Sequence, residues 1–275
     1  MIKITKILTP LFVLFLFVTN TTSAQNWRKY GNRSHEIGFM SGSAHFTTDY
    51  GERFLFKSNV GGNVGVGFGI IHYLTFVDYR YRWNQQASWW VDHFRLRNEL
   101  SYMSTDLDHF GQYVDASQTS EQADKLRAMH GKSRTINIGT QLEYHFKNIT
   151  DFGSRRDPDN KYSPYASLGV LGVFYNPSLY SDFGDGDWKA DQNILYEKWA
   201  IPGTVNDDAG FAFSVTAGLG TRKKLGEYSD IFIEAKWQYY FSNWIDALNA
   251  TDPSANNLFN DWNMFIHAGY IYYLN

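Results

Sequence analysis

Alternation of apolar and polar residues with a period of two is the feature that most limits the fold of this chain. In the stretch IFIEAKWQYYF, every second position carries an apolar or aromatic side chain, namely Ile231, Ile233, Ala235, Trp237, Tyr239 and Phe241. The positions between them hold Phe232, Glu234, Lys236, Gln238 and Tyr240. Successive side chains of a β-strand point to opposite faces, so one face of this segment is apolar and the other is mostly polar.

The same alternation recurs along the chain and predicts a series of strands. The clearest further cases are residues 94–102, 134–146, 211–222 and 262–275. Three other segments, residues 35–46, 63–76 and 162–175, are strand-like with small, glycine-rich inner faces. Glycines such as Gly65, Gly67 and Gly69 suit a tightly curved sheet in which neighbouring side chains crowd the interior. Eight strands are therefore expected.

Connections of alternating length separate these strands. The long ones follow the first, third, fifth and seventh strands, at residues 47–60, 105–133, 177–210 and 243–261. The clearest short connection is residues 223–230. Short turns alternate with long loops when antiparallel strands cross a membrane repeatedly. The pattern predicts an all-β, antiparallel, up-and-down transmembrane β-barrel of about eight strands with long outer loops, formed by residues 25–275.

Residues 1–24 have the layout of a cleaved secretory signal peptide. Two lysines precede an apolar core at residues 7–18, and small residues end at Ala24. This core is too short to span a bilayer as a helix. The mature chain is expected to begin at Gln25 and to reach the outer membrane of a Gram-negative bacterium.

Two barrel architectures fit the alternation. A soluble lipocalin-like barrel turns its apolar faces inward, whereas a membrane barrel turns them outward. Three features favour the membrane form: a signal peptide on a chain without cysteine, a last strand that runs to the final residue, and aromatic residues at segment ends. These aromatic residues are Tyr79, Tyr81, Trp83, Trp89 and Trp90 at one level, and Tyr239, Tyr240, Phe241 and Trp244 at another.

Several function classes do not fit the sequence. A net charge of -3 and a pI near 6.2 give no basic surface for nucleic acid. Without cysteine the chain has no disulfide, thiolate zinc site or thiol nucleophile. The glycine-rich stretches at residues 65–69 and 218–226 lie in strand patterns and lack the spacing of a dinucleotide-binding turn. No cofactor is expected.

The polar strand faces predict a charged barrel interior. The side chains expected to point inward are Glu36, Arg95, Arg97, Glu99, Glu143, His145, Arg222, Glu234 and Lys236. The interior of an eight-stranded barrel is just wide enough for side chains to fill it, so the favoured interpretation is an ion-pair network that plugs the lumen. The alternative is a proton path or narrow channel, which requires a gap in that network.

A hydrolase at the outer rim is the enzymatic alternative. It would place a serine and a histidine, or paired carboxylates, within hydrogen-bond reach. Ser242 and His267 lie near strand ends that could be adjacent, and Asp246 and Asp261 lie in the connection between those strands. Because no spacing joins these residues into a triad, the chain is not expected to be an enzyme.

Two loops carry further candidates. An acidic stretch with Asp182, Asp185, Asp187 and Asp191 could hold calcium, although its spacing is not that of the helix-loop-helix calcium site, and a solvated loop is favoured. In the loop at residues 106–134, Thr119 and Gln122 predict a capping box and Gly131 a C-cap for a short helix. That helix would either cover the barrel mouth or dock a protein or glycan.

The chain resembles the outer-membrane β-barrel proteins of the Bacteroidota, in particular a flavobacterial family of small barrels. The motifs that carry the resemblance are DYGERF (49–54), DHFRLRNELSY (92–102), LDHFGQYVD (107–115), SEQADKLRA (120–128), WQYYFSNWIDALN (237–249), NDW (260–262) and YIYYLN (270–275). The most specific is C-terminal and includes Tyr239, Tyr240, Phe241, Ser242, Asn243 and Trp244. More distantly, HEIGFMSGSAHF (35–46) is similar to the PorG-like proteins of type IX secretion. The resemblance implies a fold and a location, but no activity.

These observations predict a barrel that contacts outer-membrane lipid and has a structural or accessory role. Its long outer loops would bind envelope proteins, and the PorG-like stretch suggests those of type IX secretion. A narrow pore or ligand-uptake barrel is the main alternative, and a rim hydrolase acting on lipid is the third.

Overall fold

The computed structural model describes residues 34–51, 61–76, 88–152, 161–250 and 260–274. The predicted signal peptide and the aromatic residues Tyr79, Tyr81 and Trp83 lie outside these ranges. In the described part of the chain, no helix combines the length and hydropathy needed to cross a bilayer.

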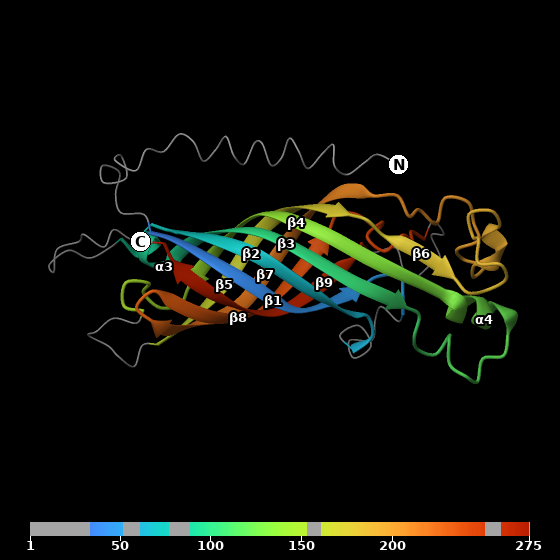
Figure 1. Cartoon of the computed structure of the whole chain (residues 1–275), viewed down its shortest axis with the longest axis horizontal. Coiled ribbons are helices and arrows are strands. Elements are labelled where there is room, and N and C mark those ends of the chain that lie inside the picture. The colour runs from blue at the N-terminus through green and yellow to red at the C-terminus, as the bar shows by residue number, and fades with distance from the viewer. Residues whose placement is uncertain (1–33, 52–60, 77–87, 153–160, 251–259, 275) are drawn as a thin grey trace.

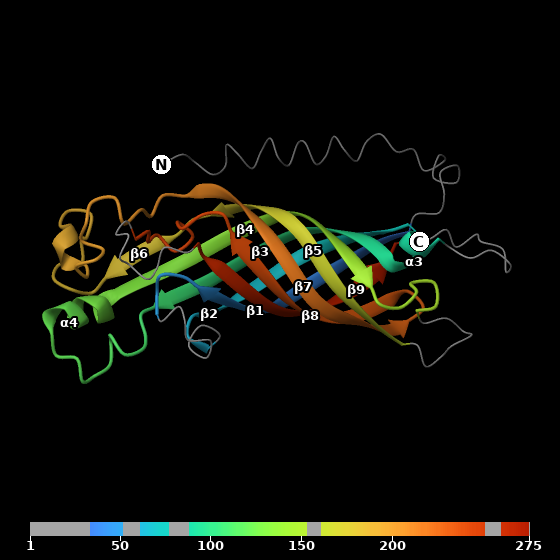
Figure 2. The same cartoon turned by 180° about the vertical axis from the view of Figure 1, so that it is seen from behind.

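One antiparallel sheet closes into a barrel (Figures 1 and 2). The barrel strands are β1 (Ser34–Thr47), β2 (Val64–Thr75), β3 (Phe94–Asp108), β4 (Met129–His145), β5 (Tyr162–Tyr175), β7 (Gly210–Gly226), β8 (Ser229–Tyr240) and β9 (Trp262–Tyr273). Each pairs with its neighbours in sequence, and pairing of β1 with β9 closes the ring. The described residues therefore form the predicted eight-stranded, up-and-down barrel; the four-residue β6 (Ser178–Ser181) only extends the sheet beyond β4.

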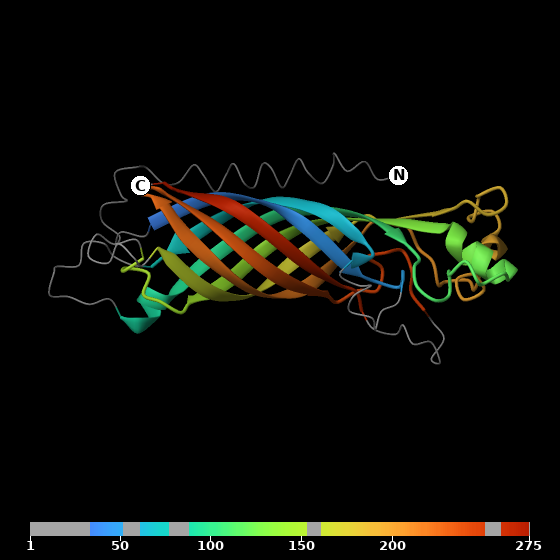
Figure 3. The same ribbon diagram turned by 90° about the horizontal axis from the view of Figure 1, so that it is seen from below.

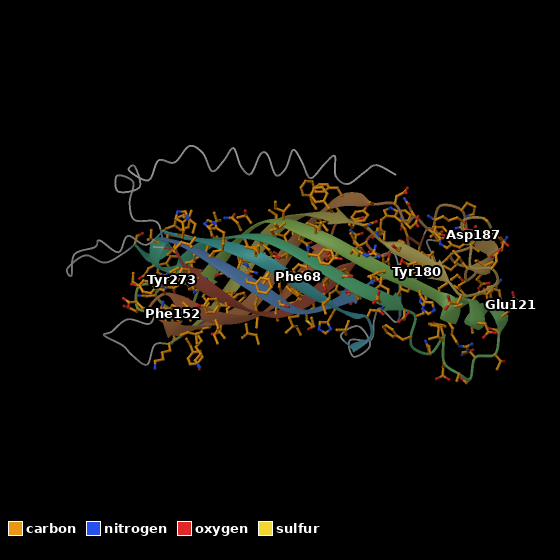
Figure 4. The ribbon with its side chains drawn as sticks, in the orientation of Figure 1. Phe68, Glu121, Phe152, Tyr180, Asp187 and Tyr273 are labelled. Carbon is orange, nitrogen blue, oxygen red and sulfur yellow. The ribbon has the colours of Figure 1, made fainter. Side chains whose placement is uncertain are left out.

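Apolar side chains cover the outside of the barrel. In β2, for example, Phe68 is 49% exposed and Ile70 is 53% exposed, whereas the alternate residues Ile71 and Tyr73 are completely buried. Phe68 is labelled in Figure 4. Because apolar groups face out and charged groups face in, the soluble lipocalin-like arrangement is excluded and the fold is that of a transmembrane barrel.

Glycines permit the close approach of strands inside the barrel. A Cβ on Gly67 would lie 2.7 Å from the ring of Phe265, and one on Gly69 would lie 2.8 Å from Met40. Since real Cβ atoms do not come so close to other heavy atoms, the prediction of a crowded, glycine-lined inner face is confirmed.

The two ends of the barrel differ strongly (Figure 3). The long connections gather at the end that we call the outer end, and the first and last described residues of the barrel lie at the opposite, inner end. At the outer end β3 and β4 pair as far as Asp108 and His130. The expected loop over residues 105–133 is therefore wrong in its bounds, since much of it is strand.

A short helix, α4 (Glu121–Ala128), tops this extension. Its N-cap is Ser120, whose hydroxyl accepts a hydrogen bond from the Ala123 amide at 3.2 Å. The predicted cap at Thr119 is therefore wrong by one residue. Gly131 does not end the helix either, because β4 begins at Met129 and contains it.

At the inner end, α3 (Trp89–His93) leads into β3 and contributes to an aromatic cluster on the barrel exterior. Trp90 stacks on Phe94 with ring centroids 4.9 Å apart, and Phe94 contacts Tyr144 at 5.3 Å. Rings with an apolar body and a polar edge suit the boundary between hydrocarbon and water.

Candidate functional site

The barrel interior is organised around the guanidinium of Arg97. Its Nη1 atom contacts the carboxylates of Glu234 and Glu143, and its Nη2 atom lies 3.2 Å from Glu99. The side chains of all four residues have no exposed surface. A buried charge is tolerated only when it is paired and hydrogen-bonded. Arg97 meets this condition by pairing with carboxylates from three strands.

Two further groups of ion pairs lie on either side of Arg97. Towards the inner end, Glu36 binds Arg95 at 3.0 Å and Arg222 at 2.9 Å. Towards the outer end, the ammonium of Lys236 contacts Glu99 at 2.5 Å, and Gln141 donates to the same carboxylate at 2.6 Å. The network therefore runs along much of the barrel axis.

The inward charges of the strands balance. The inward carboxylates of the described strands are Glu36, Glu99, Glu143, Asp230 and Glu234, and the cations are Arg95, Arg97, Arg222, Lys224 and Lys236. Five of each sign give a net charge of zero when the histidines are neutral. The lumen of the described barrel thus holds no surplus charge that would select one sign of ion.

All nine predicted lumen residues lie inside the barrel. His145 is the one not yet described. Its Nδ1 atom lies 2.8 Å from the Ser163 hydroxyl, and its Nε2 atom lies 3.4 Å from Glu143. These three side chains resemble a serine-histidine-carboxylate set, but Ser163 is only 1% exposed. Asp230, which the alternation places at the end of the short connection 223–230, is a further inward carboxylate and accepts a 2.6 Å hydrogen bond from Tyr273.

The candidate pair for a rim hydrolase does not come together. His267 is inside the barrel and pairs in register with Glu234, eight residues before Ser242 along the chain. That stretch corresponds to about 26 Å of extended strand. Ser242 instead accepts a hydrogen bond from the Trp244 amide at 3.2 Å. The grouping of His267 with Ser242 is therefore wrong.

The acidic loop is held by local turns. Asp191 accepts from the Asn193 amide at 3.0 Å at the start of a short 3-10 helix, η2 (Gln192–Ile194), and Asp187 accepts from the Ala190 amide at 3.3 Å. The Asp185 carboxylate accepts from the Asp187 amide at 3.2 Å, while Asp182 lies 3.6 Å from His130. Among the described residues, no three histidine or acidic side chains are grouped to hold a metal ion.

A second compartment, which we call the outer cap, is formed by residues 47–51, 105–133, 176–209 and 241–250 beyond the ionic lumen (Figure 4). Most of its buried side chains are apolar, although Asp49, Thr204 and Asp246 are buried there as well. The buried apolar side chains include Tyr50, Leu107, Leu126, Met129, Leu179, Ile194, Leu195, Trp199, Ile245, Ala247 and Leu248. The loops therefore form a folded layer whose buried apolar side chains belong to one hydrophobic cluster with inward residues of the barrel such as Met40 and Phe265.

Residues Ile245–Leu248 form the inner wall of the cap. The Ser133 hydroxyl donates to the carbonyl of Ile245 at 2.8 Å, and the amide of Asp49 donates to Asp246 at 2.8 Å. Leu248 makes an isolated antiparallel bridge with Val205. This four-residue segment, which belongs to the C-terminal sequence motif, ties three loops together across the mouth of the barrel.

The backbone of this segment is strained at one point. Ala247 has a φ angle of 74°, a left-handed conformation that non-glycine residues seldom adopt. Its carbonyl accepts from the Asn206 amide at 3.0 Å. Ala247 is also completely buried, so the surrounding cap holds the residue in this conformation.

Two titratable rings pack together inside the cap. Tyr50 and His109 have ring centroids 4.5 Å apart. Burial, reinforced by the charges of His130 and Lys198, lowers the pKa of His109 to about 3. Burial, followed by the charge of Asp246, raises the pKa of Tyr50 well above its usual range. Both rings are therefore neutral near pH 7.

The cap presents exposed rings to the outside. Tyr113 is 62% exposed and Tyr180 is 50% exposed, and both lie beyond the outer end of the barrel. The amide of Glu197 donates to the side chain of Gln122 at 3.0 Å, which joins α4 to the loop after β6. A rigid loop surface with exposed aromatic residues is typical of protein-binding sites.

The inner end is braced as well. Asp92 of α3 accepts from the amide and the hydroxyl of Thr150 at 2.9 and 3.0 Å, and its carbonyl accepts from the Ile149 amide. Lys224 lies 3.9 Å from the centroid of the Tyr273 ring. Polar groups at this end are thus also engaged with one another.

Comparison with known proteins returns small membrane barrels. No protein-family model and no curated protein matches the chain. Neisserial surface protein A is 10% identical, with 86% of this chain and 96% of that chain covered and a TM-score of 0.41. A major outer membrane protein of Thermus thermophilus is 9% identical, with 87% and 99% covered and a TM-score of 0.43. OprG of Pseudomonas aeruginosa is 12% identical, with 88% and 98% covered and a TM-score of 0.38.

Proposed function

We propose that the chain is a non-conducting outer-membrane barrel whose outer cap binds a protein partner at the cell envelope. The observation that carries the proposal is the division of the molecule into a charge-balanced interior and a folded, surface-exposed cap. A solute path would need a gap in the network around Arg97, whereas the cap offers a rigid surface outside the membrane.

The apolar exterior of the barrel best suits a location in the outer membrane. Closed barrels satisfy every backbone hydrogen bond within the sheet, which permits them to cross hydrocarbon. The aromatic cluster around Trp90 marks one boundary of the apolar band, and Tyr239 and Phe241, whose rings are 5.7 Å apart, mark the other. Tyr240 points inward and takes no part in this boundary.

A link to type IX secretion is the finer form of the proposal. It rests on the similarity of residues 35–46 to PorG-like proteins. In this form the cap partner is an envelope component of that secretion machinery.

Site-specific photo-crosslinking in intact cells tests the proposal. A photoreactive residue replaces Tyr113 or Tyr180 in the cap, and Tyr228, which is 52% exposed in the inner turn between β7 and β8, serves as the matched control. We expect one discrete protein adduct from the cap positions and none of the same mass from Tyr228. Identification of the adduct by mass spectrometry tests whether the partner belongs to the type IX secretion machinery. Absence of any cap adduct, or the same adduct from all three positions, would contradict the proposal.

A further inference from the structure

A row of polar side chains crosses the outward, apolar face of the barrel. The Thr140 hydroxyl donates to the Asn98 carbonyl oxygen at 2.9 Å, and the Asn98 amide nitrogen lies 3.2 Å from Nδ1 of His72. Nε2 of His72 lies 3.0 Å from Nδ1 of His35. The four residues come from β4, β3, β2 and β1, which are neighbours in the sheet.

The row lies within the apolar band. Along β3, Asn98 has Phe94 and Leu96 before it and Leu100 and Tyr102 after it on the same outward face. Along β4, Ile136 and Ile138 precede Thr140 on that face, and Leu142 and Tyr144 follow it. Polar groups at this depth are expensive in lipid, and they are therefore rare on the outside of membrane barrels.

Internal pairing does not use the full hydrogen-bonding capacity of Asn98. A carboxamide has two N–H donors and an oxygen with two lone pairs. The contacts with His72 and Thr140 use one donor and one lone pair. One donor and one acceptor remain at a half-buried side chain that faces hydrocarbon, and lipid tails offer no partner for either.

We infer that this face is the subunit interface of a homodimer in the membrane, with Asn98 at its two-fold axis. Two copies inserted in the same direction are related by an axis along the membrane normal, so a residue at the axis meets its own equivalent at the same depth. The remaining donor and acceptor of one Asn98 then match those of the other. Outward apolar neighbours such as Leu100 and Ile138 would pack around the pair.

A second copy is the occupant that the geometry favours. Any partner must cross the membrane and present both a donor and an acceptor at the depth of Asn98. A second copy meets both conditions without any further protein. Polar side chains that hydrogen-bond across membrane segments contribute about 1–2 kcal/mol in model peptides, which corresponds to about 5- to 30-fold in association.

Single-cysteine crosslinking of the full chain in phosphatidylcholine vesicles tests the inference. The protein has no cysteine of its own, so Leu100→Cys provides one probe beside the proposed axis. Ile233→Cys on β8 is the matched control, since Ile233 is 55% exposed and Leu100 49% exposed, and β8 lies four strands from β3 in either direction. We expect a short bismaleimide to give dimers at position 100, few at position 233, and about tenfold fewer at position 100 when Asn98→Leu is added.

The inference rests on the proposed membrane insertion, which is measured separately. Resistance of the barrel strands to protease in the vesicles and the change of gel mobility on heating report insertion and folding for each variant. Equal crosslinking at both positions, no dimer of the inserted protein, or unchanged crosslinking after Asn98→Leu would overturn the homodimer. A crosslink in native membranes that joins position 100 to a different protein in place of a second copy would also overturn it.

Discussion

The barrel lumen and the outer cap are both filled by buried side chains, but the two regions differ in how many of those side chains are charged. In the lumen, fully buried charged residues such as Arg97 and Lys236 lie beside apolar ones, whereas most buried residues of the cap are apolar, as Leu248 is. The difference follows from what surrounds each compartment. The barrel turns its apolar side chains towards lipid and keeps its polar side chains for the interior, while the cap stands in water and buries apolar surface in the ordinary way.

The two compartments also differ in what they can do. Every charge in the lumen is balanced by another, so the charged side chains bind one another and hold the strands in register. The apolar side chains inside the cap are covered, whereas the rings of Tyr113 and Tyr180 on its surface are exposed. Binding is therefore expected at the cap and structural stability from the lumen, and the following predictions test that division.

The largest effect is expected at Arg97. Replacement by methionine leaves Glu99, Glu143 and Glu234 as buried carboxylates without their shared cation, which should lower the free energy of unfolding by about 3–5 kcal/mol. Denaturant unfolding in vesicles measures this loss. Lys189→Met is the control, because Lys189 is 61% exposed in its pair with Asp207 and should change stability by less than about 1 kcal/mol. Equal effects of the two variants would contradict a stabilising role for the lumen network.

A smaller and local effect is expected in the cap core. Leu248→Ala removes a completely buried side chain and should destabilise the cap by about 2–5 kcal/mol. Hydrogen exchange should show loss of protection in residues 241–250, while the amides of the barrel strands outside the cap remain protected. Loss of protection throughout the barrel would mean that the two compartments do not unfold separately.

Acid is expected to weaken the cap through His109. A histidine in an unfolded chain titrates near pH 6.5, whereas burial lowers the pKa of His109 to about 3. Between these values the unfolded cap binds more protons, so stability is complete above about pH 6.5 and falls as the pH decreases towards 3. Protection factors of cap amides measured from pH 7 to pH 4 should fall more in the native chain than in His109→Phe. Identical pH dependence in both chains would show that His109 is not the responsible group.

The smallest effect is expected at Ala247. Glycine would relieve the left-handed conformation, which costs about 1–2 kcal/mol for other residues, but it would also remove a buried methyl group and increase the entropy of the unfolded chain. These terms nearly cancel, so Ala247→Gly should change cap stability by less than about 1 kcal/mol. A loss as large as that of Leu248→Ala would show that the methyl group itself is required.

Sequence periodicity predicted the barrel better than the cap, for a physical reason. Inward and outward residues alternate within each strand, so the positions of Glu234 and Lys236 are local information. The cap core joins Tyr50, Leu195 and Leu248 from three separate loops, and no local period links them. Likewise, the alternation places Ser242 just after one strand and His267 on its neighbour, but only the register shows that they are far apart along the barrel. The polar row through Asn98 also requires register, since each strand contributes one residue.

Conductance of single proteins in planar bilayers tests the central claim most directly. Because the ion pairs around Arg97 fill the barrel and the segment Ile245–Leu248 crosses its outer mouth, inserted protein should give no steady current steps at either polarity. Insertion is established in the same preparation by protease resistance of the strands. Steady, reproducible single-channel steps from the inserted native chain would contradict the account and would favour a narrow pore.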